Sequence, residues 1–254
     1  DQVSGAYSHL LGLRLAGPFA HDLETTNWAD NLVVAAVRAL AEACDISPRV
    51  TISLHKNLPV AAGLGGGSSD AAATLRALAR LWGLDPLDVR LHAVAESLGA
   101  DVPACLLQYP VVVGGRGEII SQAPALPAAW LVLVNPCIPL ATADVFRQFS
   151  EPGSQSAPLG KAPAGLDAMV AALMARSNDL EQPAMRIVPQ ISEIIETISK
   201  SDGCLLARMS GSGATCFGIY AAEATAVTAA AQISNGHDSW WVSTAQMLTS
   251  SVTQ

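Results

Sequence analysis

The sequence predicts an α+β protein whose C-terminal part has a ferredoxin-like order of elements. Strand and helix patterns alternate over residues 9–99, and a helix, two strands, a helix and a strand follow one another over residues 187–243. Half of the 254 residues are apolar and 14% are charged, which is typical of a compact protein with a sizeable core. This length is compatible with one large domain or with two smaller ones.

The first half alternates between short strands and amphipathic helices. Its strands are rich in β-branched residues or alternate with period two, whereas its helices carry apolar residues at helical spacing. Asp30 or Asn31 is available as an N-cap, and Asp85-Pro86 is typical of an N-cap with Pro at the first helical position. The expected elements are strands at 9–16 and 49–55 and helices at 30–43, 69–81 and 85–99.

The second half begins with two short apolar runs that are typical of buried strands. The segment from Pro158 to Pro163 carries two prolines and a glycine, so it is the best candidate for a linker. The expected elements are strands at 111–113, 130–134, 204–208, 215–220 and 240–243 and helices at 187–199 and 221–233. This order predicts an antiparallel sheet backed by helices.

Composition excludes several classes of function. A formal net charge of −8, without a basic stripe, disfavours nucleic acid as a partner. No apolar run reaches the roughly 18 residues that a membrane-spanning helix needs, so we expect a soluble, cytoplasmic protein. The five cysteines are widely spaced without a C-x-x-C pair, which predicts reduced thiols and no metal site.

The most informative segment places four glycines within the five residues 63–67 and runs directly into an alanine-rich helix. Successive glycines cost conformational entropy, so the folded chain needs backbone approach or positive φ there. The helix start offers free N–H groups and the positive end of its dipole, both of which favour a phosphate. Walker A is excluded because no lysine follows the loop, and Ser68 at the third glycine position makes the dinucleotide fingerprint a weak match.

The pattern Pro-x-x-x-Gly-Leu-Gly-Gly-Gly-Ser-Ser from Pro59 to Ser69 resembles the phosphate loop of the galactokinase, homoserine kinase, mevalonate kinase and phosphomevalonate kinase (GHMP) superfamily. With Lys56-Asn-Leu in front of it, the segment is most similar to the kinases of 4-diphosphocytidyl-2-C-methyl-D-erythritol. The alternatives are a flexible linker or tight helix–sheet packing, and a linker rarely leads directly into a strong helix.

The resemblance implies a two-domain GHMP kinase fold, with a mixed sheet-and-helix domain at residues 1–125 and a ferredoxin-like domain at residues 126–254. It implies ATP and Mg²⁺ as cofactors and transfer of the γ-phosphoryl group to the 2-hydroxyl of a cytidine diphosphate sugar alcohol. The chain is expected to act as a monomer or homodimer in non-mevalonate isoprenoid biosynthesis.

Two further segments are similar to motifs of this superfamily. Leu98-Gly-Ala-Asp-Val-Pro103 resembles the segment with the catalytic aspartate, although Asp101 could instead be an ordinary helix cap. Ala207 to Phe217 resembles the glycine-rich turn that approaches nucleotide and acceptor, although the same glycines suit a plain hairpin turn.

Weaker matches complete the expected site. Asn31 and Lys56 match positions beside the adenosine pocket, their alternatives being a helix cap and a solvated charge. Phe146 lies in a segment similar to the one that helps to bind cytidine, whereas an isolated Phe is more often core. The expected catalytic residue is Asp101. The expected ATP-binding residues are Asn31, Lys56, Pro59, Val60, Ala61, Ala62, Gly63, Leu64, Gly65, Gly66, Gly67, Ser68 and Ser69. The expected acceptor-binding residues are Thr142, Phe146, Gly211, Ser212 and Gly213.

The sequence departs from this pattern at its start. The resemblance implies a Pro-Ala-Lys-Xaa-Asn strand whose lysine polarises the acceptor or the phosphate, and this strand has no counterpart in the sequence. We therefore expect an upstream segment to be missing. The alternatives are another GHMP kinase with a different acceptor, or a nucleotide-binding remnant with impaired catalysis.

Overall fold

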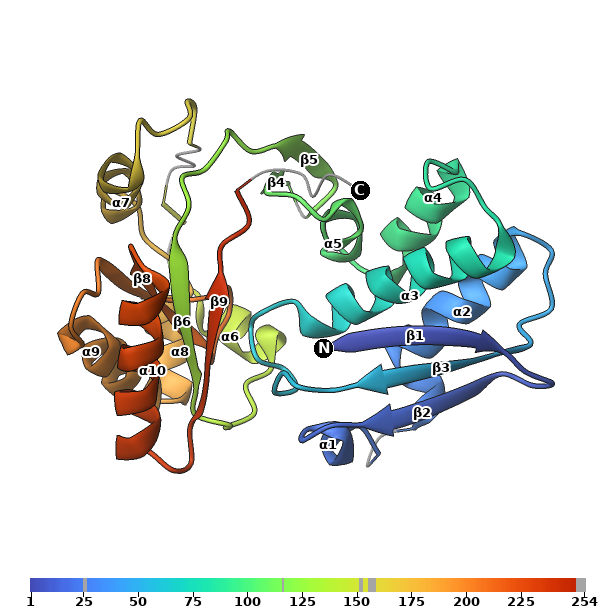
Figure 1. Ribbon diagram of the computed structural model, residues 1–254, viewed down its shortest axis with the longest axis horizontal. Coiled ribbons are helices and arrows are strands. Elements are labelled where there is room, and N and C mark those ends of the chain that lie inside the picture. The colour runs from blue at the N-terminus through green and yellow to red at the C-terminus, as the bar shows by residue number, and fades with distance from the viewer. Residues whose placement is uncertain (25–26, 116, 151–152, 155–158, 250–254) are drawn as a thin grey trace. The chain divides into compact units, whose positions relative to one another are not determined.

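The computed structural model describes residues 1–24, 27–115, 117–150, 153–154 and 159–249. The chain forms two compact units (Figure 1). The first unit contains Asp1–Val60 and Gly65–Ser121, and the second contains Ala61–Leu64 and Gln122–Gln254. The change at residue 121 lies four residues before the expected boundary at 125, and the assignment of Ala61–Leu64 to the second unit has no counterpart in the sequence pattern.

The first unit is built on a three-stranded mixed sheet of order β1-β3-β2 (Figure 1). The strands are β1 (Gln2–Tyr7), β2 (Gly12–Ala16) and β3 (Val50–His55). The central strand pairs antiparallel with β1 and parallel with β2. The three apolar residues of β3, Val50, Ile52 and Leu54, alternate with polar ones and are buried against helices, as the period-two pattern predicts.

Helices supply the rest of the core of the first unit. They are α1 (Ala20–Glu24), the 3-10 turn η1 (Trp28–Asp30), α2 (Leu32–Ala43), α3 (Gly66–Trp82), α4 (Val89–Leu98) and α5 (Val102–Leu107). A hairpin of β4 (Val111–Gly114) and β5 (Ile119–Gln122) follows them in the chain. Buried side chains of α2, α3 and α4, among them Leu40, Leu75 and Leu91, pack into one cluster with β3. This packing holds the start of α3 in a fixed place.

The first unit differs from the sequence predictions at the start of the strand expected at 9–16, which begins at Gly12, at the start of one helix and in a strand that was not predicted. The helix expected from Asp85-Pro86 begins at Val89, because the Asp85 carboxylate accepts the Leu87 N–H in a separate turn and Asp88 caps the helix through Arg90 N–H. The strand β1 was not expected, because only one of its six residues, Val3, is strongly apolar and pairing with β3 defines it.

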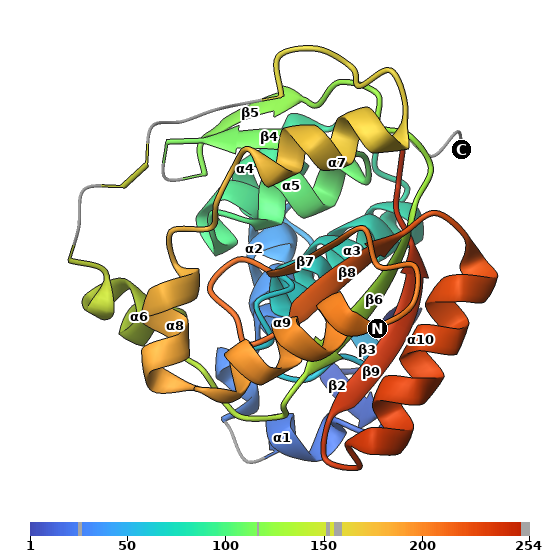
Figure 2. The same cartoon turned by 90° about the vertical axis from the view of Figure 1, so that its left-hand side faces the viewer.

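The second unit contains a four-stranded antiparallel sheet of order β7-β8-β6-β9. The strands are β6 (Trp130–Asn135), β7 (Leu206–Met209), β8 (Cys216–Tyr220) and β9 (Trp241–Gln246), and the helices are α6 (Thr142–Gln148), α7 (Leu166–Met174), α8 (Glu181–Ile187), α9 (Gln190–Lys200) and α10 (Glu223–Gly236). The helices α9 and α10 lie on the same face of this sheet (Figure 2). This arrangement confirms the ferredoxin-like expectation.

The two faces of this sheet carry separate clusters. Val132 and Val134 of β6 pack with the isoleucines of α9 on one face, whereas Ile219 of β8 packs with Met169 of α7 on the other. The linker expected between Pro158 and Pro163 does not separate the two units, because the residues on both sides of it belong to the second unit. Pro158 itself lies outside the described residues.

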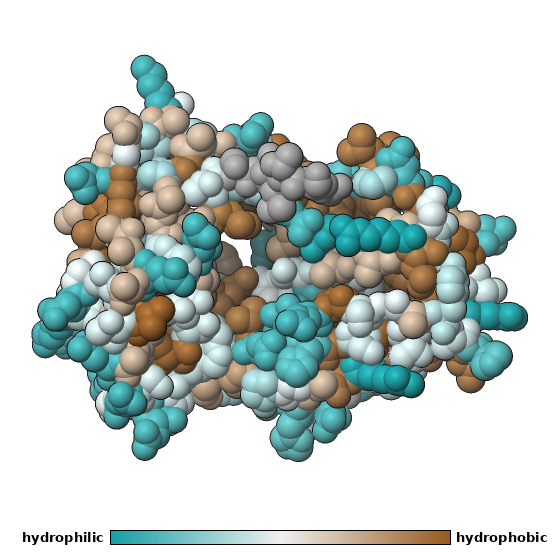
Figure 3. All heavy atoms as spheres, viewed as in Figure 1, coloured by the Kyte–Doolittle hydropathy of each residue, from teal (hydrophilic) through white to brown (hydrophobic). Residues whose placement is uncertain are grey.

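Hydrophilic and hydrophobic residues are interspersed over both units on the face shown in Figure 3. Within the described part of the chain, no helix has the length and hydropathy to span a bilayer.

Candidate active site

The glycine loop opens α3 without a side-chain cap. Gly65, the N-cap, adopts a left-handed conformation with φ of 63°, and no side chain bonds to the first turn. The first intrahelical bond runs from Ser69 N–H to Gly65 C=O at 2.8 Å, so the N–H groups of Gly66, Gly67 and Ser68 precede the helical ladder. A helix start with this geometry is suited to an anion.

The structure brings the expected glycine-rich turn of residues 210–215 against the start of this loop. Ser210 Oγ donates to the Gly63 carbonyl at 3.0 Å, and Thr215 N–H donates to the Ala62 carbonyl at 3.1 Å. A Cβ on Gly63 would lie 2.3 Å from the Gly213 carbonyl oxygen, and Gly63 has a φ of 71°. Only glycine therefore fits at position 63 without displacing the turn.

A second segment also holds this turn. Asn178 Nδ2 donates to the carbonyls of Met209 and Gly211 at 3.1 and 2.8 Å, while its Oδ1 accepts the Leu180 N–H at 3.0 Å. The Glu181 carboxylate accepts the Met209 N–H at 3.1 Å. The segment Ser177–Leu180 resembles a family segment in sequence, but nothing local connects Asn178 with a turn some thirty residues further along the chain, so these hydrogen bonds were not expected.

The expected acceptor-binding residues of the second unit divide into two kinds. Thr142 and Ser212 share a hydrogen bond of 2.8 Å between their hydroxyls, which links α6 to the glycine-rich turn. Phe146 is 56% exposed on α6, so the alternative that it belongs to the core is wrong. Its aromatic face is free to stack on a planar group.

Asp101 lies at the first residue before α5 and is exposed. Its side chain makes no capping hydrogen bond, so the alternative of an ordinary helix cap does not describe it. The pKa of the Cys105 thiol, one turn later in the chain, is raised first by burial and then by the negative charge of Asp101. Because the Asp101 carboxylate is exposed and does not cap the helix, it is free to accept a proton from a ligand.

Asn31 and Lys56 occupy different surroundings. Asn31 caps α2, its Oδ1 accepting the Val33 N–H at 2.9 Å, and it also lines a pocket described below. Lys56 is 3% exposed, so the alternative of a solvated charge is wrong. Its ammonium lies 2.6 Å from the Asp1 carboxylate and 2.8 Å from that of Asp70.

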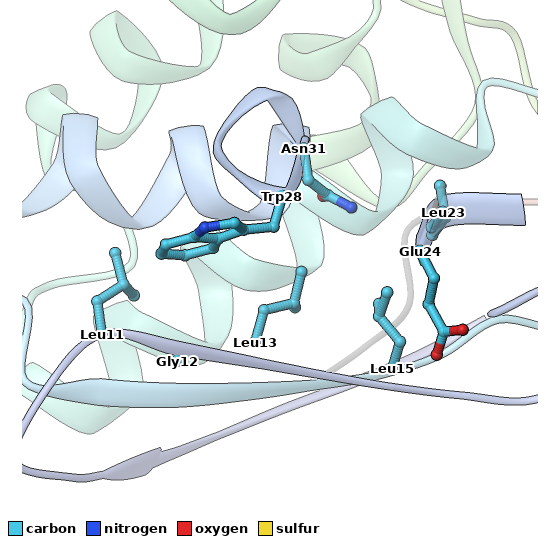
Figure 4. A pocket seen from close by; sticks show the side chains of 8 residues that line it. All are labelled: Leu11, Gly12, Leu13, Leu15, Leu23, Glu24, Trp28 and Asn31. Atoms are coloured by element: carbon cyan, nitrogen blue, oxygen red, sulfur yellow. The ribbon is translucent and has the colours of Figure 1, made fainter. Parts of the chain in front are cut away.

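An open pocket of about 380 Å³ lies in the first unit (Figure 4). Leu13 and Leu15 of β2 and Leu11 just before it point to the same side, and the indole ring of Trp28 lies over Leu11 and Leu13. The Arg38 guanidinium lies 5.4 Å from the centre of that ring, a cation–π distance that helps to hold the indole. The lining residues are Leu11, Gly12, Leu13, Leu15, Leu23, Glu24, Trp28 and Asn31.

Of these lining residues only Asn31 was expected at the site. The signal that could have found the others is the alternation of Leu11, Leu13 and Leu15, which places three apolar side chains on one face of a strand. Within the described residues no group of three or more His, Cys, Asp or Glu side chains lies close enough together to hold a metal ion.

Family models cover much of the chain. The N-terminal domain of GHMP kinases matches residues 31–109, and the C-terminal domain of GHMP kinases matches residues 163–238. The 4-diphosphocytidyl-2-C-methyl-D-erythritol kinase of Paramagnetospirillum magneticum is 47% identical over 98% of this chain and 86% of the relative. The chain belongs to the 4-diphosphocytidyl-2-C-methyl-D-erythritol kinase family. The member of this family from Rhodospirillum rubrum is 45% identical over 94% of this chain and 78% of its own length.

Solved structures agree with this membership of the 4-diphosphocytidyl-2-C-methyl-D-erythritol kinase family. A crystal structure of 4-(cytidine 5'-diphospho)-2C-methyl-D-erythritol kinase matches with a TM-score of 0.74 and 32% identity, over 95% of this chain and 84% of that one. A homoserine kinase from Cytophaga hutchinsonii has a TM-score of 0.70 at 16% identity, over 98% of this chain and 85% of that one. This second likeness shows the shared GHMP fold. The chain is an ATP-dependent GHMP small-molecule kinase.

Proposed function

We propose that this kinase transfers the γ-phosphoryl group of ATP to the 2-hydroxyl of 4-diphosphocytidyl-2-C-methyl-D-erythritol, in non-mevalonate isoprenoid biosynthesis. The observation that carries the proposal is the uncapped, glycine-rich start of α3 in a chain 47% identical to a kinase of that name. Phosphoryl transfer requires positioning and charge stabilisation more than covalent chemistry. Backbone N–H groups at a helix start supply both for a triphosphate.

The segment from Pro59 to Ser69 is the proposed cradle of the triphosphate. Gly66, Gly67 and Ser68 present N–H groups that no side chain caps, and Ser69 is exposed beside them. These donors are fixed before the nucleotide arrives, because α3 is packed into the core along its length. Preorganised donors lose little free energy to reorganisation when charge develops on the phosphate.

Asp101 is the proposed acceptor of the hydroxyl proton. An exposed carboxylate without a capping role can orient the attacking hydroxyl and take up its proton as the phosphorus–oxygen bond forms. The γ-phosphoryl group leaves ADP and the proton passes to the Asp101 carboxylate, so charge and atoms balance.

The leucine- and Trp28-lined pocket is the proposed site of the adenine base. Its volume of about 380 Å³ and its apolar walls suit a flat base, and the Asn31 amide offers a polar group at the edge of the pocket. Asn31 Oδ1 is committed to the start of α2, so its Nδ2 is the group that would donate to a ring nitrogen.

The second unit supplies the proposed acceptor-binding residues. Thr142, Gly211, Ser212 and Gly213 lie on the turn and the helix that the hydroxyl pair joins, and Phe146 offers a stacking face for cytosine. Mg²⁺ usually binds through phosphate oxygens with only one or two protein ligands. The hydroxyls of Ser68 and Ser69 would supply an oxygen ligand of the kind that a loop Ser or Thr gives in P-loop enzymes. When bound, the ion would neutralise the phosphate charge.

A substrate panel tests the proposal. The protein is incubated with Mg-ATP and with 4-diphosphocytidyl-2-C-methyl-D-erythritol, mevalonate or homoserine, and ADP is measured. We expect ADP only with the first acceptor. Faster turnover of mevalonate or homoserine would favour another GHMP kinase, and ATP binding without transfer to any acceptor would favour a nucleotide-binding remnant.

The monomer or homodimer state and the cytoplasmic location remain predictions.

A further inference from the structure

Three charged side chains from three separate parts of the first unit meet in one buried cluster. Lys56 follows β3, Asp1 precedes β1, and Asp70 lies in the second turn of α3. The Lys56 ammonium pairs with both carboxylates, and the three side chains are only 4–6% exposed. We call this group the Lys56 cluster.

The Lys56 cluster also holds the backbone around it. The second oxygen of the Asp1 carboxylate accepts the N–H groups of Asn57 and Leu58 at 2.7 and 2.9 Å. The Lys56 backbone N–H donates to the Ala16 carbonyl at 2.7 Å, which ties the cluster to the end of β2. The entry to the glycine loop is therefore fixed by Asp1 before β1, by Ala16 of β2 and by Asp70 of α3.

The Lys56 cluster lies directly beneath the first residue of the phosphate-binding helix. A Cβ on Gly66 would lie 3.3 Å from Lys56 Nζ and 3.8 Å from the Asp1 carboxylate. Counted over the three side chains alone, one ammonium and two carboxylates sum to a formal charge of −1, and this side-chain charge lies beneath a helix start that is suited to an anion. Without Lys56, that charge would be −2 and would oppose any triphosphate bound there.

Stability alone does not account for such a group. A buried ion pair is often no more stabilising than apolar residues of the same volume, because both charges lose their hydration. Its demonstrated use elsewhere is to fix one arrangement of packed elements. The position of the Lys56 cluster indicates which arrangement that is, namely the first two turns of α3 against the residues next to β1, β2 and β3.

We propose that Lys56 is a positioning residue that binds no nucleotide itself: it fixes the start of α3 and offsets the carboxylate charge beneath the bound triphosphate. This inference rests on the proposed ATP-binding function. It predicts that the protein binds the nucleotide more weakly as the formal charge of the Lys56 cluster becomes more negative. This should hold even for a variant whose stability falls while its nucleotide affinity is kept.

The test is equilibrium binding of a non-hydrolysable ATP analogue, measured by calorimetry together with the thermal midpoint Tm. Lys56→Met changes the cluster to −2, and we expect the Kd to rise about tenfold. Adding Asp70→Asn to that variant restores a formal charge of −1 on the cluster, and the double variant should recover most of the affinity for the ATP analogue. Asp70→Asn alone brings the formal charge of the cluster to 0 and keeps the ion pair of Lys56 with Asp1. This variant loses one buried ion pair, so its Tm should fall. It should nevertheless bind the analogue at least as tightly as the unmodified protein.

The matched control is Lys200→Met, which removes the same charge from an exposed pair with Glu196 in the second unit. We expect its Kd to equal that of the unmodified protein, because an exposed pair contributes little. If Lys56→Met fails to fold, Asp70→Asn still decides, since a purely structural role requires it to weaken binding as Tm falls. Weaker binding by Asp70→Asn, or equal binding by Lys56→Met, would overturn the inference. Failure of the unmodified protein to bind the analogue would instead contradict the proposed function.

Discussion

Replacing Gly63 with alanine tests the contact between the glycine loop and the glycine-rich turn. The new Cβ would lie 2.3 Å from the Gly213 carbonyl oxygen, whereas a carbon and an oxygen normally stay roughly 3.3 Å apart. The turn must therefore move by about 1 Å, which breaks the bonds from Ser210 to Gly63 and from Thr215 to Ala62. Two hydrogen bonds and a left-handed alanine together cost about 2–5 kcal/mol.

A matched control separates backbone strain from the clash. Gly83 has a φ of 69°, close to the 71° of Gly63, but a Cβ there meets nothing within 4 Å. Gly83→Ala therefore carries only the left-handed cost of about 1–2 kcal/mol, or roughly 2–8 °C in Tm for a chain of this size.

The assay is steady-state kinase activity together with Tm for both variants. Gly63→Ala should lower Tm further than Gly83→Ala and reduce kcat/KM about 100-fold, the usual effect of a misplacement near 1 Å. Gly83→Ala should keep the kcat/KM of the unmodified protein. Equal Tm values for the two variants with unchanged kcat/KM would refute the argument that this contact positions the loop.

Three further perturbations test other parts of the account. Asp101→Asn should lower kcat by roughly 10²–10⁴ and leave the Kd of an ATP analogue unchanged, and near-normal turnover would remove Asp101 from its proposed role. Asn178→Ala removes both donors to the turn and should reduce kcat/KM about tenfold, whereas an unchanged value would mean that Glu181 suffices. Burial first of all raises the pKa of Tyr220 to about 12 from 10.0, so its contribution to stability is complete below pH 10 and lost toward pH 12. Tyr220→Phe should remove that part of the alkaline fall in Tm, and an identical fall in both proteins would contradict this assignment.

The sequence was sufficient to predict a helix or strand where the segment itself contains the apolar spacing and the cap that define it. The helix α2 was expected within two residues of its observed bounds, because its apolar spacing and the Asn31 cap are both local. The same holds for β3, whose alternation matches one buried face. The start of α4 was misplaced because Asp85 and Asp88 are both competent caps and local sequence does not choose between them.

Contacts between distant residues could not be predicted. The glycines predicted a phosphate loop, but the bond that joins Gly63 to Ser210 spans 147 residues of sequence. In the same way the sequence offers Lys56 only as a residue beside the adenosine pocket or as a solvated charge, whereas the fold brings the Asp1 and Asp70 carboxylates to it. Charge and hydrogen-bonding capacity are visible in a sequence, whereas their partners depend on the fold.

The position of the transferred phosphate tests the central claim most directly. Carbon 2 of 4-diphosphocytidyl-2-C-methyl-D-erythritol carries a methyl group and no hydrogen, so a phosphate on its hydroxyl has no proton on the attached carbon. After reaction with Mg-ATP, a proton-coupled phosphorus NMR spectrum should show a new phosphomonoester as an unsplit line, together with ADP. A new line split by carbinol protons would place the phosphate on another hydroxyl, and no new phosphomonoester would contradict the proposed activity.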